Sequence, residues 1–144
     1  MRKFFMVLAL CALTLAPAPR SGAQAPERYK VRLTTVPMDG GMRNTVAGFG
    51  SASATLVGNK LSIAGTFDGL KSPATSATLH TGVAKGVRGN SIGNFTSTNA
   101  TKGSISGSID LSPDQVKGLR EGKLYLEIAS EKAPEGNLWG WLLK

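Results

Sequence analysis

Apolar and polar residues alternate along most of the chain beyond residue 28, with the period of two that is typical of a strand with one buried face. Clusters of glycine, proline, asparagine and aspartate separate the alternating segments, and these residue types favour turns. The segments that we expect to form strands are 29–35, 46–57, 61–67, 75–81, 92–96, 105–111, 123–130 and 137–143. Such short strands, joined by brief turns, predict an all-β fold, either an antiparallel Greek-key β-sandwich or a barrel.

One segment departs from this pattern and predicts a short helix. Ser112 can cap the first free amides, Pro113 suits the first helical position, and Gln115 can complete a capping box. Gly122 can end the turn. We therefore expect a helix of two turns over residues 113–120.

The first 23 residues carry the three parts of a secretory signal. A basic pair at residues 2 and 3 is followed by an apolar run over residues 4–16 and then by small residues. The run is too short to span a bilayer as a helix, which takes roughly 20 apolar residues. We therefore expect a signal peptide over residues 1–23 with cleavage after Ala23, and cleavage after Ala25 is the second choice.

The only cysteine, Cys11, lies inside this apolar run, so the chain beyond Ala23 can form no disulfide. Small secreted domains of eukaryotes are usually rich in disulfides, so this composition favours a bacterial envelope protein, periplasmic or extracellular. The remaining length suits one domain, which we place at residues 28–144. The stability of that domain must come from packing alone.

Basic residues exceed acidic residues in the predicted domain. Beyond Ala23 the chain has 14 Lys and Arg residues and 9 Asp and Glu residues, which gives a net charge of +5. The basic residues are scattered except for Arg28, Lys30 and Arg32, which alternate along the first strand and form a basic strip. A nucleic-acid footprint requires clustered charge, so no nucleic-acid partner is expected. The strip predicts at most weak contact with an anionic envelope surface.

Several short motifs follow one another in a recognisable order. They are Val36-Pro37, Gly48 with Gly50, Asp68-Gly69-Leu70, Ala77-Thr78-Leu79-His80-Thr81-Gly82, Gly122-Lys123-Leu124-Tyr125, and Pro134-Glu135-Gly136 with Gly140. Together they resemble the CHRD domain, which is named from chordin and is common as a lone exported domain in bacteria. The resemblance covers residues 29–142. It implies a β-sandwich of immunoglobulin-like or superoxide-dismutase-like character, without established enzymatic activity.

Metal binding in this family would depend on three histidine positions. The family pattern has a His-x-His pair in the strand at residues 75–81 and a third histidine in the strand after the helix. Alternate positions on a strand share a face, so such a group could bind a transition metal. Here the three positions hold Thr78, His80 and Ala129. Because zinc and copper take three or four protein ligands, we expect no metal and no cofactor, and His80 is only a weak metal candidate.

Side chains that could act in catalysis are present without the spacing of a known site. With one histidine and no Gly-x-Ser-x-Gly elbow, nothing marks a catalytic triad. The glycine-rich segment 82–90 lacks the Gly-Lys-Ser/Thr ending of a phosphate loop, and we interpret it as a flexible hairpin. We therefore expect a protein that is not an enzyme. The alternative is a metal-dependent or hydrolytic enzyme centred on His80 and nearby carboxylates.

Trp139 and Trp141 point to the same side of the last expected strand, and Leu138 with Leu142 points to the other. The family keeps apolar residues at the leucine positions and usually has Arg and Gln in place of the tryptophans. The resemblance thus implies that the tryptophan side is normally solvated. An exposed pair would form a flat aromatic strip for sugar rings or a protein partner. Alternatively, loops such as residues 38–45 fold over the strand and bury both rings as a second small core.

These patterns together predict an exported, non-enzymatic β-module. We expect its partner to be a protein or a polysaccharide of the envelope or the extracellular space. Trp139 and Trp141 are the first candidate binding residues. The basic strip of Arg28, Lys30 and Arg32 is a second candidate surface.

Overall fold

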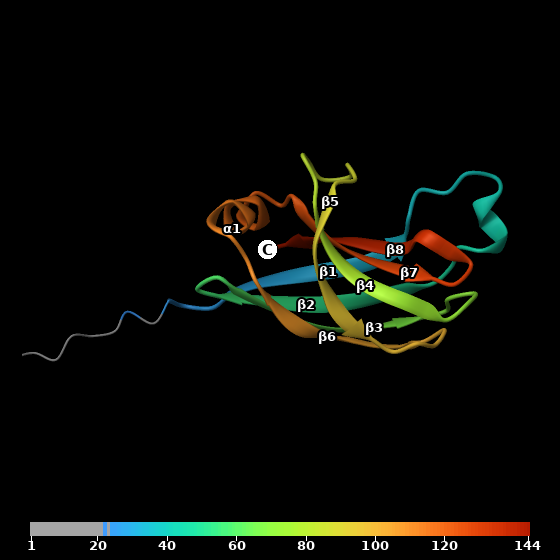
Figure 1. Ribbon diagram of the computed structural model, residues 1–144, viewed down its shortest axis with the longest axis horizontal. Helices are drawn as coiled ribbons and strands as arrows, with labels where there is room; N and C mark the ends of the chain where they lie inside the picture. The colour runs from blue at the N-terminus through green and yellow to red at the C-terminus, as the bar shows by residue number, and fades with distance from the viewer. Residues whose placement is uncertain (1–21, 23) are drawn as a thin grey trace, which may run out of the picture.

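The computed structural model describes residue 22 and residues 24–144, and eight of its strands form a closed antiparallel barrel (Figure 1). The expected signal peptide, residues 1–23, lies outside the described residues apart from Gly22. In chain order the elements are β1 (Glu27–Thr35), η1 (Met42–Asn44), β2 (Phe49–Val57), β3 (Lys60–Asp68), β4 (Ala74–Thr81), β5 (Asn90–Ser97), β6 (Gly103–Asp110), α1 (Pro113–Arg120), β7 (Leu124–Ser130) and β8 (Ala133–Leu143).

The strands follow one another around the barrel in the order β1-β2-β3-β6-β5-β4-β7-β8, and β8 pairs with β1 to close it. The barrel is a Greek key because β3 pairs with β6 and β4 pairs with β7, although neither pair is consecutive in the chain. The prediction of an all-β fold with one short helix is confirmed, and of the two expected architectures the structure has the barrel. The seam between β5 and β6 is short, since only Thr96 and Ser97 pair across it.

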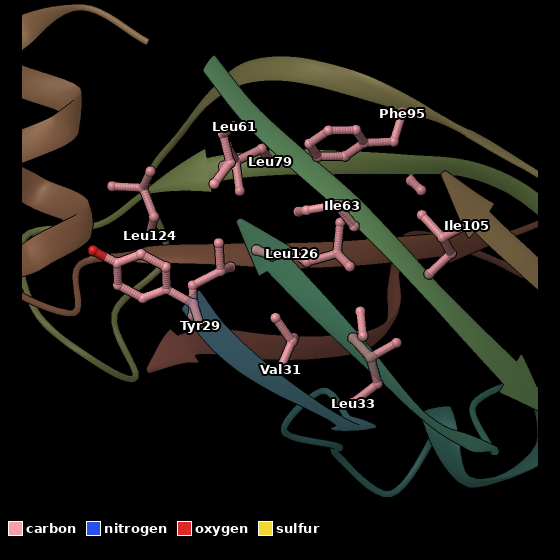
Figure 2. Packing of buried hydrophobic residues seen from close by; sticks show 14 of the residues in the cluster. Tyr29, Val31, Leu33, Leu61, Ile63, Leu79, Phe95, Ile105, Leu124 and Leu126 are labelled. Carbon is pink, nitrogen blue, oxygen red and sulfur yellow. The ribbon is translucent and has the colours of Figure 1, made fainter. Parts of the chain in front are cut away.

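One apolar core fills the barrel and receives side chains from every strand (Figure 2). Tyr29, Val31 and Leu33 of β1 are buried there, as the alternation in the sequence predicts. Val116 and Leu119 of α1 belong to the same cluster, so the helix covers one end of the barrel (Figure 1). Each fully buried leucine contributes about 2 kcal/mol relative to an exposed one, so this core can hold the fold without a disulfide.

A second, smaller apolar cluster is separate from the barrel core. It consists of Val36, Val46 and Ala133, with Met42 and Trp139 packed against it. The buried side chain of Asn137 lies beside it and satisfies both backbone polar groups of Ala47. Asn137 Oδ1 accepts from the Ala47 amide at 3.1 Å, and Asn137 Nδ2 donates to the Ala47 carbonyl at 3.0 Å.

Two strands begin three or more residues away from the positions expected from the sequence, and the other boundaries differ by two residues or fewer. β2 begins at Phe49, because the backbone just before it bonds to the Asn137 side chain instead of a neighbouring strand. β8 begins at Ala133, so residues 133–136, which were expected to be a turn, are strand. Gly136 takes a φ of +121° there, a value that side-chain-bearing residues rarely adopt.

The expected helix is confirmed in position and in its capping. Ser112 Oγ accepts from the Gln115 amide at 3.2 Å, and Gln115 Oε1 accepts from the Ser112 amide at 2.9 Å, which is the reciprocal capping box. In the described part of the chain, no helix is long and apolar enough to cross a membrane.

The close approach of β1 and β8 depends on Gly140. A Cβ atom added at Gly140 would lie 2.5 Å from the Arg32 carbonyl oxygen, much closer than two such atoms can approach. Leu138 and Leu142, on either side of it, are fully buried in the barrel core as expected. The closure of the barrel therefore requires a glycine between these two leucines.

Candidate functional site

The outer face of β4, β7 and β8 gathers the polar and aromatic side chains that alternate with the core residues. We call it the covered face. Pairing between neighbouring strands aligns it in two rows: His80 with Tyr125 and Trp141, and Thr78 with Glu127 and Trp139. The candidate metal residue and both candidate binding tryptophans are thus brought onto one surface.

The rings on the covered face pack on one another and do not form a flat strip. His80 stacks on Tyr125 with centroids 5.0 Å apart and an interplanar angle of 11°. Trp141 lies 4.6 Å from Tyr125, and Trp139 meets Trp141 edge-on at 6.0 Å and 64°. Trp141 is only 9% exposed, whereas Trp139 is partly exposed. The tryptophans share a side, as predicted, but neither of the two expected arrangements holds in full.

The loop between β4 and β5, residues 82–89, lies against this surface. Arg88 of the loop donates to Glu127 Oε2 at 3.0 Å and to the Glu135 carbonyl at 2.9 Å, and its guanidinium lies 5.7 Å from the Trp139 ring centroid. The Gly89 amide donates to the Tyr125 hydroxyl at 3.0 Å. These contacts hold the loop 82–89 against β7 and β8, although the sequence suggested a flexible hairpin there. Residues 38–45 contribute less, through Met42, which packs, as Trp139 does, against the small apolar cluster of Val36, Val46 and Ala133.

Glu127 is the most perturbed acid on the covered face. Burial raises the pKa of the Glu127 carboxyl above its usual value, and the charges of Arg88 and His80 act in the opposite direction. His80 Nε2 lies 3.9 Å from Glu127 Oε1, and His80 Nδ1 lies 3.2 Å from the Gly89 carbonyl oxygen. A Cβ added at Gly136 would lie 2.9 Å from the Glu127 carboxyl carbon, so the chain closes tightly over this group.

An open groove lies where β1, β8 and the loop 82–89 meet. Its volume is about 340 Å³, and it is lined by Lys30, Arg32, Lys85, Trp141, Leu143 and Lys144. Because β1 pairs with β8, two of the three residues of the basic strip lie beside one of the two candidate tryptophans. Arg28 lies farther along β1, and Trp139 belongs to the second apolar cluster, so neither lines the groove.

The family model for the CHRD domain matches residues 31–142, which is most of the chain. The chain belongs to the CHRD domain family. Comparison with curated proteins and with solved structures finds no match. In this CHRD domain two of the motif glycines have structural roles. The lack of a side chain at Gly136 leaves room for the buried Glu127 carboxyl group, and the lack of one at Gly140 leaves room for the backbone of β1.

The three histidine positions of the CHRD pattern do not form a metal site in this chain. Thr78 and His80 lie on β4 and Ala129 lies on β7, but only His80 carries a metal-binding side chain. Thr78 Oγ1 instead bonds to Asn94 Oδ1 at 3.0 Å. Throughout residues 24–144, no three His, Cys, Asp or Glu side chains are grouped to hold a metal ion. The donor set does not fit a zinc or copper ion.

Sequence reasoning missed the partners of the predicted residues. Tyr125 and Glu127 alternate with Leu124, Leu126 and Ile128, so their outward direction could have been found from the pattern of the strand. Their contacts with the loop 82–89 could not, because that loop folds back across two strands. Lys85 lines the groove because it lies on this loop, and Lys144 lines it because it follows β8, which pairs with β1.

Proposed function

We propose that this CHRD domain is an exported, non-enzymatic binding module whose partner is a polysaccharide of the envelope or the extracellular space. The observation that carries the proposal is the open groove in which Trp141 lies beside Lys30 and Arg32. Sugar-binding sites commonly combine an aromatic wall with polar groups that fix orientation. Part of each of the two surfaces that the sequence suggested separately lines this groove, which supports the proposal.

The covered face supports the non-enzymatic part of the proposal. An acid–base catalyst must come within hydrogen-bond reach of its substrate. Glu127 is 9% exposed, with Arg88 bonded to it, and the Tyr125 hydroxyl is engaged by the backbone of the loop 82–89. Neither His80 nor Glu127 lines the groove, which favours binding over catalysis there.

The export part of the proposal rests on the sequence. Residues 1–23 have the basic start, apolar run and small-residue exit of a secretory signal. The chain beyond them has no cysteine, so the barrel does not depend on the redox state of its compartment. Mass spectrometry of the protein recovered from a secreting host should give a mature chain that begins at Gln24.

Binding to polysaccharides tests the proposed function directly. The chain from residue 24 onward contains the whole barrel and can be assayed by affinity electrophoresis in gels that contain soluble polysaccharides. We expect Arg32→Ala to be retarded measurably less than the parent, and Lys60→Ala, on the far strand β3, to be retarded as strongly as the parent. Equal retardation of both variants, or no retardation by any polysaccharide, would contradict the proposal. Release of shortened sugar chains would favour the hydrolytic alternative at His80.

A further inference from the structure

We infer that the groove takes an acidic polysaccharide, a linear sugar chain that carries carboxylate groups. The inference rests on the proposed function and adds the chemical class of the ligand. It follows from the charge of the groove, the line in which part of that charge is arranged, and the small exposed part of its aromatic wall.

The groove is lined by cations and by no acid. Within the described part of the chain, Lys30, Arg32 and Lys85 form no ion pair, so their charges are available to a ligand. Lys144 Nζ lies 2.9 Å from Glu27 Oε2, but Arg120 pairs with the other oxygen of the same carboxylate at 2.6 Å. Two cations thus share one acid, and the groove keeps a surplus of positive charge.

Part of the charge follows a line along β1. Arg28, Lys30 and Arg32 stand on the outer side of β1, where alternate residues repeat about every 7 Å. Lys85 comes from the loop between β4 and β5, and Lys144 follows β8. A row of cations beside a groove matches a polymer with regularly repeated negative groups. The polymer loses its translational and rotational entropy only once, at the first contact, so each further contact adds to the affinity.

The apolar wall is too small to hold a neutral sugar by stacking alone. Trp141 is 9% exposed because Tyr125, Trp139 and the loop 82–89 pack around it, so only a small part of its ring can contact a ligand. Leu143 is the other apolar lining residue. Charge must therefore supply most of the binding, and Trp141 gives the sugar backbone a fixed surface to lie against.

The same wall favours a polysaccharide over other polyanions. Single-stranded nucleic acid is normally held by open aromatic faces on which bases stack, and the groove has none. An anionic membrane is flat, and the cations line a recess. Val83 and Val87, on the loop that supplies Lys85, are 76% and 44% exposed, but both are small, and insertion into a membrane interface normally uses Trp, Phe or Leu side chains.

A matched pair of ligands tests the inference. The chain from residue 24 onward would be titrated with polygalacturonate, with alginate, and with polygalacturonate whose carboxylates have been reduced to alcohols. We expect the acidic chains to bind at least about tenfold more tightly than the reduced chain, and to weaken with added salt. Equal binding of the acidic and reduced chains would overturn the inference and leave the proposed function standing. No binding of any of them, with no retardation in the wider polysaccharide assay, would overturn both.

A matched pair of variants locates the site. The triple variant Lys30→Gln, Arg32→Gln, Lys85→Gln should lose about tenfold in affinity, which is the effect of three exposed charge contacts. The triple variant Lys60→Gln, Lys102→Gln, Lys117→Gln has the same net charge but changes exposed residues away from the groove, and it should stay within about twofold of the parent. Equal losses would show that only net charge matters and would overturn the inference. Tighter binding to phosphatidylglycerol vesicles or single-stranded DNA than to both acidic polysaccharides would also overturn it.

Discussion

At the scale of single residues, Glu127 is the group on which the covered face depends. Its carboxylate loses solvation on folding, and Arg88 compensates by donating to it at 3.0 Å. Removing one partner of such a pair is costly because the other charge is left buried. Removing both partners costs much less stability, because no unpaired charge is left buried.

We therefore expect Arg88→Met to lower the free energy of unfolding by about 2 kcal/mol, less than for a fully buried pair because Arg88 is half exposed. In the double variant Arg88→Met with Glu127→Gln, at least half of that loss should be recovered. Urea denaturation of the wild type, the two single variants and the double variant measures the coupling. Additive losses would show that Arg88 stabilises the loop 82–89 independently of Glu127.

The residue scale is also where sequence reasoning succeeded and failed within one strand. The directions of Trp139 and Trp141 were predictable, because alternation along a strand is local. Their exposure was not, because it depends on Arg88 and the rest of the loop 82–89 and on the small cluster against which Trp139 packs, which come from other parts of the chain. For β8, the sequence therefore predicted correctly which way the tryptophan side chains point, but it did not determine how far they are exposed.

At the scale of elements, α1 shows what local signals can determine. Its cap, its first residue and its end are all set within eleven residues, from Ser112 to Gly122, and each was predicted. β8 shows the opposite case. Pro134-Glu135-Gly136 has the composition of a turn, but the Glu135 carbonyl accepts from Arg88, 47 residues earlier, and Asn137 binds Ala47, 90 residues earlier.

The capping box of α1 predicts a measurable loss on mutation. Ser112→Ala removes the acceptor for the Gln115 amide and should lower the free energy of unfolding by about 1 kcal/mol. Ser108→Ala, at an exposed position of β6, is the control and should stay within about 0.5 kcal/mol of the wild type. Chemical denaturation would compare them. An equal effect of the two substitutions would mean that the cap does not stabilise the barrel.

At the scale of the whole molecule, an ion cluster joins the beginning of β1 to α1 and to Lys144. Hydrogen bonds from Arg120 and then from Lys144 and Tyr29 lower the pKa of Glu27 to about 2. Since this lies below the ordinary value of 4.5, the cluster stabilises the fold fully above pH 4.5, and its contribution is lost as the pH falls towards 2.

Glu27→Gln should therefore destabilise the barrel by about 1 kcal/mol at neutral pH. The difference from the wild type should shrink between pH 4.5 and 2 and vanish below it. Thermal unfolding across this range, with both proteins in the same buffers, would measure it. A constant difference at all pH values would show that Glu27 acts through packing and not through its charge.

The choice between sandwich and barrel belongs to this scale and lay beyond the sequence. Both architectures need the same alternating strands, and they differ only in whether the outermost strands meet. Here they meet through pairs such as Val31 with Leu142, more than a hundred residues apart in the chain. The groove arises at this junction, so it could not be anticipated before the ring was known to close.

Ring closure also governs how the protein can be made. A ribosome delivers β1 first and β8 last, so a nascent chain that ends before Ala133 carries seven strands with two free edges, on β1 and on β7. Free edges can template pairing with other chains. The barrel can therefore close only when synthesis is nearly complete, because β8 must pair with both β7 and β1. A stalled or truncated chain therefore exposes the unpaired edges of β1 and β7, which favour aggregation, and the closed barrel pairs both edges.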